Sequence, residues 1–240
     1  MRHRLSITIH SREPTVTAAN GGEISVLGQS ITRNSLLLAL FAVCTTALIA
    51  GTFLLTQDKI VLQKRLAEEK ALLEIIPRSR HDNSMLDDTV AVGPEDTGLD
   101  LREEKHIYVA RKQGIVSAVI IPAVARDGYT GDIELIVGVN RDGSIAGVRA
   151  LAHRETPGLG DKVDIRKSDW VLGFEGRSLE NPALTGWAVK KDKGEFDQFT
   201  GATITPRAVV AATLRVLQFA EANKTRLFEL KEPAPTEGES

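Results

Sequence analysis

Threonines gather in one short segment near the C-terminal end of the chain, and one of them could carry a covalent group. Thr200, Thr203 and Thr205 lie in the sequence Asp197-Gln198-Phe199-Thr200-Gly201-Ala202-Thr203-Ile204-Thr205-Pro206. A threonine hydroxyl can accept a phosphoester only where the active site of another enzyme reaches it, and Gly201 and Ala202 leave the approach to Thr203 free of bulk. The residue types around Thr203 therefore meet this requirement for access.

The residues that follow Thr203 predict the start of a helix. Thr205 and Pro206 are typical of an N-cap and a first helical residue, and a long helical pattern follows them. A phosphate on Thr203 would lie near the positive end of this helix, where free amides and the macrodipole favour an anion. Because Pro206 has no N–H, we expect the donors to be Arg207, Ala208 and their neighbours. An ordinary threonine-rich helix start is the alternative interpretation.

A second motif lies upstream, His153-Arg154-Glu155-Thr156-Pro157-Gly158-Leu159-Gly160-Asp161-Lys162. Proline presets φ and glycine supplies left-handed conformations, so residues 156 to 160 could form a plain connecting turn. In the functional interpretation this glycine-rich backbone approaches a bound cofactor, and Glu155 and Lys162 supply polar contacts. Lys162 or Arg154 could balance the charge of a phosphate, or either could be a solvated surface group.

The two motifs, in this order, resemble the FMN-binding domain family. In that family an Asp, two variable residues, a Ser or Thr and then Gly-Ala-Thr form a flavinylation motif. A separate flavin transferase joins FMN to the last threonine through a phosphoester. The resemblance implies FMN held covalently on Thr203, with further cofactor contacts from Asp197, Thr200, Gly201, Ala202, Thr205, Glu155, Thr156, Pro157, Gly158, Leu159, Gly160 and Lys162.

Other residues near the motifs have more than one interpretation. Asp197 would help the transferase to recognise or activate the acceptor, or it is an exposed loop carboxylate. His153 could contact the flavin, although a lone histidine is more often a surface or packing residue. Phe199 and Trp187 could pack on the flavin ring, but we expect both to belong to the core. We assign no residue a catalytic or metal-binding role.

A long apolar run predicts a membrane anchor. Residues 35 to 56 contain no charged side chain, and a helix of that length is roughly 33 Å long, enough to cross a hydrocarbon core of about 30 Å. A buried core helix is the alternative. A cleaved signal peptide is disfavoured, because the run is long, begins late and is followed by Gln57-Asp58-Lys59 without a small-residue cleavage site. We predict a retained single span in the lipid bilayer.

The charges beside the span do not determine its orientation. The two flanks are balanced, with Arg2, Arg4, Arg12 and Arg33 before it and Lys59, Lys64, Arg65 and Lys70 after it. The family resemblance alone implies a domain on the periplasmic side of a bacterial inner membrane. The only cysteine, Cys44, lies in the span, so the soluble part has no disulfide and no cysteine metal or redox site.

Breaks in the sequence pattern divide the chain into segments. We expect a flexible cytoplasmic N-terminal extension (1–34), a transmembrane helix (35–56), a stalk helix and acidic connector (57–104), an FMN-binding domain (105–231) and a disordered tail (232–240). In the stalk, Leu62, Leu66, Leu73 and Ile76 would share one face, and Arg65 and Glu69 are spaced for i,i+4 pairing. Pro77 should end this helix.

The domain itself should be an α+β fold. Runs rich in β-branched residues at 107–110, 115–121, 133–139 and 144–148 predict strands, with a hairpin turn at Asp142-Gly143. A further strand is expected at 185–190 and a closing helix at 206–230, with Val210, Leu214 and Leu217 on its core side. Together these elements predict an extracytoplasmic domain with a largely antiparallel sheet and a C-terminal helix.

Composition limits the classes of function. The chain has 240 residues, 42% hydrophobic, with a net charge of −2, which leaves room for one span and a soluble domain of ~150 residues. The sequence pI is about 6.2 with interspersed charges, so there is no basic stripe for nucleic acid, and the two tryptophans and two tyrosines offer no stacking platform.

Together the span, the β-rich body and the two motifs resemble the G-subunit family of the Rnf (or Rsx) electron-transport complexes. The related C subunits of sodium-translocating NADH:quinone reductases share the anchor and the Gly-Ala-Thr site. His153-Arg154 before the loop and Asp161-Lys162 after it favour the Rnf family. The resemblance implies an electron relay in ion-coupled transfer between ferredoxin and NAD. It also implies the other membrane and peripheral subunits and a flavin transferase as partners, without independent substrate turnover.

Other classes of function remain open. A membrane-anchored extracytoplasmic binding or sensor domain would share the span and the α+β body but would not need an acceptor threonine. A membrane-tethered hydrolase would need a nucleophile with its base, and the sequence contains no Gly-x-Ser-x-Gly or His-Glu-x-x-His pattern.

Overall fold

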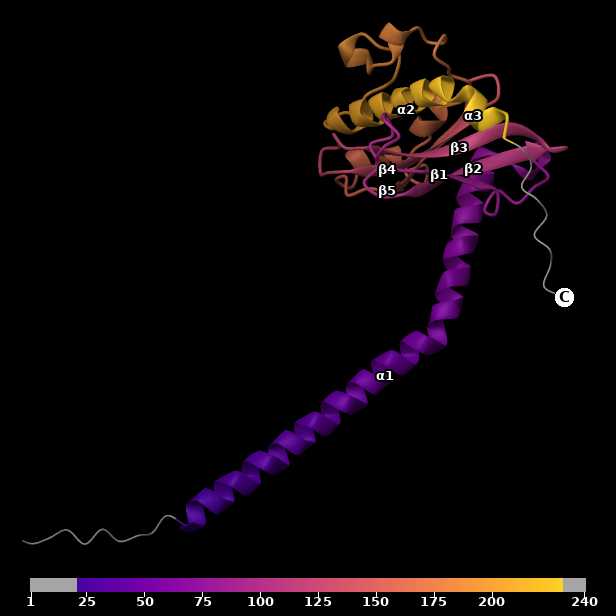
Figure 1. Cartoon of the computed structure of the whole chain (residues 1–240). Helices are drawn as coiled ribbons and strands as arrows, with labels where there is room; N and C mark the ends of the chain where they lie inside the picture. Colours follow the sequence, from indigo (N-terminus) through magenta and orange to yellow (C-terminus); the bar gives the residue numbers. More distant parts are fainter. Residues whose placement is uncertain (1–20, 231–240) are drawn as a thin grey trace, which may run out of the picture. The chain divides into compact units, whose positions relative to one another are not determined.

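The computed structural model describes residues 21–230, and the expected tail at 232–240 lies outside them. The chain divides into two compact units, Met1–Leu62 and Gln63–Ser240. A single long helix, α1 (Gly21–Ile75), begins in the first unit and ends in the second (Figure 1).

The first unit contains the apolar part of α1. The most apolar 18-residue window within Arg33–Gln57 has a mean hydropathy of 2.2, and none of that window is buried in protein, as expected for a helix that meets lipid. The Thr52 hydroxyl donates to the Leu48 carbonyl one turn earlier, at 2.7 Å, which satisfies a polar group inside an apolar helix. The helix already begins at Gly21, so residues 21–34 of the expected extension are helical, and residues 1–20 of it lie outside the described residues.

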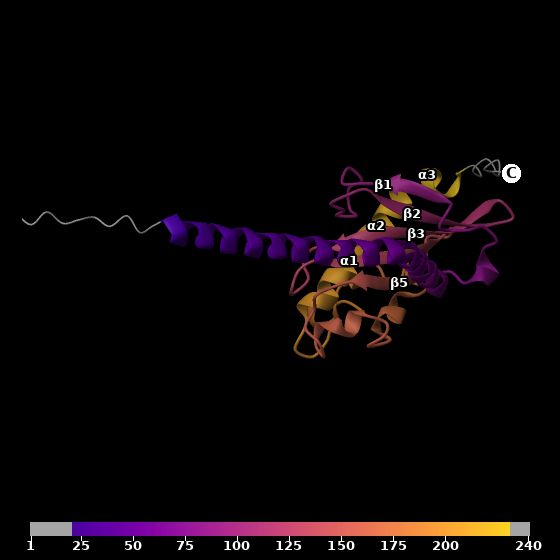
Figure 2. The ribbon, with the colours of Figure 1, turned by 90° about the horizontal axis from the view of Figure 1, so that it is seen from below.

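The second unit is built on a five-stranded sheet in which every neighbouring pair is antiparallel. Its order is β1 (Thr89–Val92), β2 (Lys105–Lys112), β3 (Ile115–Ala125), β4 (Ile133–Asn140) and β5 (Ile145–Ala152) (Figure 2). The predicted hairpin joins β4 to β5: the Gly143 amide donates to the Asn140 carbonyl at 2.9 Å, and Gly143 has φ 86°. The antiparallel sheet of the predicted α+β fold is therefore confirmed.

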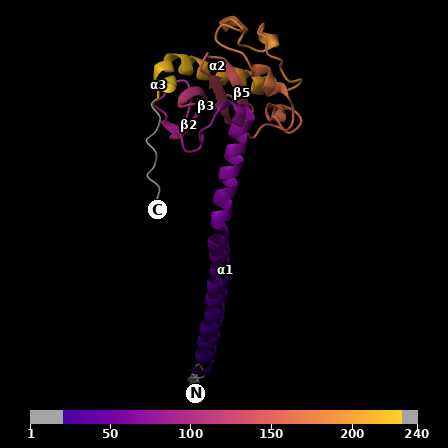
Figure 3. The same cartoon turned by 90° about the vertical axis from the view of Figure 1, so that its right-hand side faces the viewer.

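Helices cover both faces of this sheet. On one face lie α2 (Ile204–Ala222) and α3 (Lys224–Phe228), and on the other the last turns of α1 (Figures 1 and 3). Strand β3 shows the consequence, because Val119 packs in the core that includes α2 while Ile120 packs in the smaller core that includes the end of α1. A strand buried on both faces needs a continuous apolar run, which is what β3 has.

The end of α1 differs in detail from the predicted stalk. Leu72, Ile75 and Ile76 are buried against the sheet, whereas Leu66 is 47% exposed. Arg65 does not pair with Glu69 as its spacing suggested. It bonds Asp87 at 2.6 Å instead, and Glu69 pairs with Arg78. The acidic connector contributes the edge strand β1, so the sheet begins before the predicted domain start at residue 105.

The segment between β5 and α2 contains short 3₁₀ turns: η2 (Gly160–Val163), η3 (Trp170–Phe174), η4 (Leu184–Gly186) and η5 (Lys190–Asp192). The predicted strand at 185–190 is absent from this described segment; only an isolated bridge joins Val189 to Phe196. Packed aromatic rings hold the segment instead, with the Phe174 and Phe196 centroids 4.7 Å apart. The predicted closing helix is divided at Asn223, which ends α2 and precedes α3.

Candidate functional site

The site starts from a tight turn just before α2. The Ala202 amide donates to the Phe199 carbonyl at 3.1 Å, which places Thr200 and Gly201 at the two central positions of a β-turn. Gly201 has φ 80°, the conformation that the third position of a type II turn requires and that glycine adopts without strain. Thr200 and Gly201 are exposed, so the turn lies on the domain surface.

Thr203 lies at the start of the helix that follows this turn, and its side chain makes no capping hydrogen bond. It is the N-cap residue of α2 and is partly exposed, and its carbonyl accepts the Arg207 amide at 3.3 Å. The prediction that Thr205 is the N-cap was therefore wrong. The prediction that the Arg207 amide is a free donor was also wrong, because this amide donates the first hydrogen bond of the helix. The first-turn amides of Ile204 and Thr205 are the ones without an intrahelical acceptor.

Thr205 is instead joined to the upstream motif. It is 0% exposed, and its hydroxyl donates to Oε2 of Glu155, which is itself only 4% exposed. The other carboxylate oxygen of Glu155 accepts the amide of Thr130 at 3.0 Å and lies 3.1 Å from the Thr130 hydroxyl, whose single proton is shared with the Arg154 carbonyl. Motifs 50 residues apart in the sequence thus meet through one buried carboxylate. Protein groups donate hydrogen bonds to both of its oxygens.

Glycine at position 160 is required by this contact. A Cβ on Gly160 would lie 2.6 Å from Oε2 of Glu155 and 2.8 Å from Oγ1 of Thr205, so any side chain there would push the two groups apart. A Cβ on Gly201 would lie 3.5 Å from Cδ2 of Leu159, which places the loop beside the turn that precedes Thr203. The upstream loop is therefore more than a connection between strands.

Internal bonds shape the rest of this loop. The amides of Leu159 and Gly160 both donate to the Thr156 carbonyl at 3.1 Å, and Nδ1 of His153 accepts the Glu155 amide at 3.2 Å. His153 thus orders the backbone beside the buried carboxylate. Of the remaining predicted contacts, Pro157 and Gly158 are exposed, and Thr156 and Lys162 are partly exposed.

Asp197 and Arg154 lie on the surface. The Asp197 side chain is 69% exposed and pairs with Nζ of Lys190 at 2.6 Å, so another protein can reach it. The Arg154 side chain is exposed as well, while its carbonyl accepts the Thr130 hydroxyl at 2.5 Å.

The turn rests on an aromatic cluster. Phe199 and Trp187 are both buried, which confirms the prediction that they are core residues. Trp170, which was not predicted from the sequence, packs edge-on against Phe199 with centroids 5.0 Å apart. Its Nε1 donates to the Asp197 carbonyl at 2.8 Å. Trp170 also packs edge-on against Phe174, four residues later, but its contacts with Phe199 and Asp197 join parts of the chain that no local sequence signal connects.

Ion pairs fix the edges of the site. Arg207 makes two bonds to Asp192, at 2.5 and 2.6 Å, and these hydrogen bonds lower the pKa of the Asp192 carboxyl. Hydrogen bonds from Arg166 likewise lower the pKa of Asp164, against the opposing effect of burial. Both carboxylates are therefore held in their charged forms by arginine. Within residues 21–230, no group of three or more His, Cys, Asp or Glu side chains could hold a metal ion.

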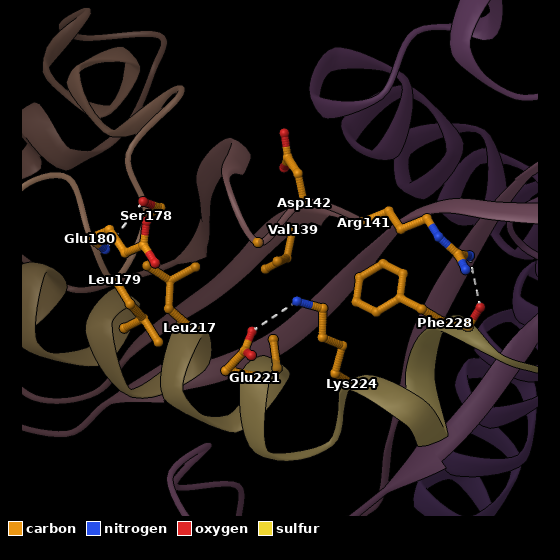
Figure 4. A pocket seen from close by; sticks show the side chains of 12 residues that line it. Val139, Arg141, Asp142, Ser178, Leu179, Glu180, Leu217, Glu221, Lys224 and Phe228 are labelled. Carbon is orange, nitrogen blue, oxygen red and sulfur yellow. Dashed lines mark hydrogen bonds and ion pairs between the residues drawn. The ribbon is translucent and has the colours of Figure 1, made fainter.

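A cavity of about 270 Å³ lies at the other end of α2. Leu179, Leu217 and Phe228 give it apolar walls, and its rim carries charges that include the Glu221–Lys224 pair at 3.3 Å (Figure 4). Arg141 at its edge donates to the Phe228 carbonyl at 3.0 Å. None of the residues predicted from the two motifs lines this cavity, so it is separate from the Thr203 site.

Comparison with known proteins places both parts of the chain in one family. Family models match residues 24–75, as the RnfG N-terminal region, and residues 128–218, as an FMN-binding domain. The G subunit of the ion-translocating oxidoreductase complex of Pseudomonas aeruginosa is 49% identical over 207 residues, covering 86% of this chain and 96% of the relative. The corresponding G subunit from Vibrio cholerae is 43% identical, with 88% and 99% covered.

A solved structure is also similar. The crystal structure of NqrC from Shewanella oneidensis matches 62% of this chain and 72% of its own, at 24% identity and a TM-score of 0.42. The extent and identity of the sequence matches, by contrast, define the family without ambiguity. The chain therefore belongs to the RnfG family, the G subunits of ion-translocating oxidoreductase complexes.

Proposed function

We propose that this protein is a membrane-anchored electron carrier of an Rnf-type complex, with FMN attached by a phosphoester to Thr203. The observation that carries the proposal is the position of Thr203. It is a partly exposed N-cap that directly follows an exposed turn. Because a modifying enzyme must reach the hydroxyl from outside, this exposure meets the first requirement for flavin transfer.

The residues around Thr203 fit a flavin phosphate. The first-turn amides of α2 point toward the N-cap, where the helix dipole favours an anion. Gly201 keeps the approach open, and the exposed Gly158 adds a second stretch of backbone without a side chain. Lys162 and Arg154, on the loop joined to α2 through Glu155, are the cations that would balance the phosphate charge.

The chain's own contribution is placement. FMN supplies the redox chemistry when it is bound. Thr203 keeps the group from diffusing away, and the aromatic cluster under Phe199 together with the Glu155 contact gives the attachment point a firm base. The partners in electron transfer would be the other subunits of the complex, in ion-coupled transfer between ferredoxin and NAD.

The test of attachment is Thr203→Ala, compared with Thr203→Ser, in the full chain co-expressed with an active flavin transferase. Loss of the hydroxyl should abolish covalent flavin, whereas serine should retain it. Intact mass, peptide mapping and in-gel flavin fluorescence after denaturation measure this directly. Thr225→Ala, at an exposed position on α3, is the matched control and should load as the wild type does.

Two results would contradict the proposed attachment of FMN to Thr203. Flavin retained by Thr203→Ala after denaturing electrophoresis would exclude Thr203 as the attachment site. A wild-type chain that gains no FMN mass, beside a control substrate that is loaded, would favour an anchored binding domain instead. In membranes containing the whole complex, Thr203→Ala should also stop NAD reduction driven by reduced ferredoxin.

A further inference from the structure

The contact between Glu155 and Thr205 holds three separate parts of the chain together. Glu155 follows the end of β5, Thr130 lies in the turn between β3 and β4, and Thr205 is in the first turn of α2. All the bonds meet on one carboxylate, which is nine-tenths buried, as is Thr205. Thr203 is two residues from Thr205, so the flavin attachment point is tied to the sheet through this carboxylate.

The chemistry of Glu155, Thr205 and Gly160 favours a strong contact between the loop and α2. A hydrogen bond to an ionised group is stronger than one between neutral groups, and loss of one buried partner leaves the other unsatisfied. The carboxylate also lies at the first turn of α2, where the helix dipole favours a negative charge. Gly160 allows the close approach, since a Cβ there would lie within 2.8 Å of both groups.

We infer that Glu155 and Thr205 are positioning residues that fix the flavin-bearing turn on the domain for electron transfer, and that they are not needed for attachment. This inference rests on the proposed flavinylation of Thr203. Attachment uses the exposed turn, which the modifying enzyme meets from outside. Electron transfer, by contrast, needs a flavin held at a fixed place relative to the next carrier.

Flavin attachment and electron transfer can be separated, because the Glu155–Thr205 contact takes no part in the phosphoester bond that forms at Thr203. In attachment, Oγ1 of Thr203 bonds to the flavin phosphorus of a flavin dinucleotide, and the pyrophosphate P–O bond breaks. The nucleoside monophosphate then leaves as the threonine hydroxyl loses its proton. Thr205 cannot serve as the acceptor, because its hydroxyl is buried and already donates to Glu155.

The decisive variant is Thr205→Val, which keeps the shape of the side chain and removes its hydroxyl. Thr213→Val is the matched control, because Thr213 is also fully buried on α2 and its hydroxyl donates to the Val209 carbonyl at 2.8 Å. Thr205→Ser restores the donor. Glu155→Gln is a second perturbation, which keeps the volume of the side chain but removes the charge.

The measurements use the full-length protein in detergent, first in the form that carries no flavin. Amide hydrogen exchange in the peptide that contains residues 199–208 should be about tenfold faster, or more, in Thr205→Val than in Thr213→Val. Thr205→Ser should return it to within about threefold of the wild type. After loading, FMN occupancy should match the wild type, while the fluorescence anisotropy of the bound flavin should fall in Thr205→Val and Glu155→Gln.

Either of two results would overturn the inference: exchange and anisotropy in Thr205→Val equal to those of Thr213→Val, or a loss of FMN occupancy that follows loss of the contact. Failure of the wild type to take up flavin is a different outcome, because it refutes the proposed attachment. The exchange experiment on the unloaded protein would still decide whether the contact fixes the turn.

Discussion

Thr205 shows how much a single side chain depends on partners far along the sequence. Its position before Pro206 resembles an N-cap, yet its hydroxyl donates to Glu155, 50 residues away, and Thr203 takes the cap position. Local chemistry predicted that this segment starts a helix and that Phe199 and Trp187 are buried. It could not predict the buried carboxylate contact, because nothing near Thr205 in the sequence specifies Glu155.

Gly160 provides a test of the close approach between Glu155 and Thr205. We expect Gly160→Ala to lower the free energy of unfolding by about 2 kcal/mol, because the new Cβ overpacks the space between Glu155 and Thr205. Gly173→Ala is the control, since no atom lies within 4 Å of a Cβ built there, and it should change stability by less than about 0.5 kcal/mol. Thermal unfolding of the full-length variants in detergent measures both, and equal transitions would contradict the steric argument.

At the scale of elements, regular periodicity was the reliable guide. Strands β3, β4 and β5 and the turn between the last two follow from β-branched runs and an Asp-Gly turn. Strand β1 was missed because it has only four residues inside an acidic connector and is held by pairing with β2. The predicted strand at 185–190 was wrong because Trp187 packs into an aromatic cluster. A Cβ at Gly194, moreover, would lie 1.9 Å from the Ala188 carbonyl oxygen, which shows how tightly the chain turns there.

The element η2 is joined to the loop after it by Asp164, whose pairing makes stability depend on pH. Hydrogen bonds from Arg166 lower the pKa of the Asp164 carboxyl below its ordinary value of 3.8. A carboxyl whose pKa is lower in the folded state stabilises the fold above the unfolded pKa, and this contribution is lost as pH falls through the folded value. The contribution should therefore be complete at neutral pH and disappear below pH 3.8.

Asp164→Asn tests this dependence. At pH 7 it should lower the free energy of unfolding by about 1 kcal/mol, a modest value because Arg166 is exposed to solvent. As pH falls below 3.8 and through the lower folded-state pKa of Asp164, the variant and the wild type should converge. Chemical unfolding of both proteins across this range measures the difference, and a constant gap would exclude Asp164 as the titrating group.

At the scale of the whole molecule, the presence of a membrane span and the side of the membrane that the domain occupies are separate problems. The apolar segment of α1 gives the chain one helix, among residues 21–230, that is long enough to cross a membrane. The balanced charges beside it leave the side occupied by the domain to experiment. We propose the periplasmic side, consistent with the proposed place of the protein in an Rnf-type complex.

Cysteine labelling tests this orientation with little background, because Cys44 is the only native cysteine. In a Cys44→Ala protein, Thr225→Cys on α3 should react with a membrane-impermeant maleimide when intact spheroplasts are treated. Ser6→Cys, before the span, should react only after the membrane is lysed. The opposite pattern would place the domain in the cytoplasm.

The exposed turn at Thr200 and Gly201 has a consequence for how the protein matures. If Thr203 is the acceptor, as proposed, its place beside a turn that is exposed on the folded domain would keep it available long after translation and membrane insertion have finished. A pool of unloaded chains would therefore be neither misfolded nor wasted. Cells short of flavin could assemble the protein into its complex first and complete it when the vitamin supply recovers, so that cofactor supply rather than protein synthesis would set the amount of working carrier.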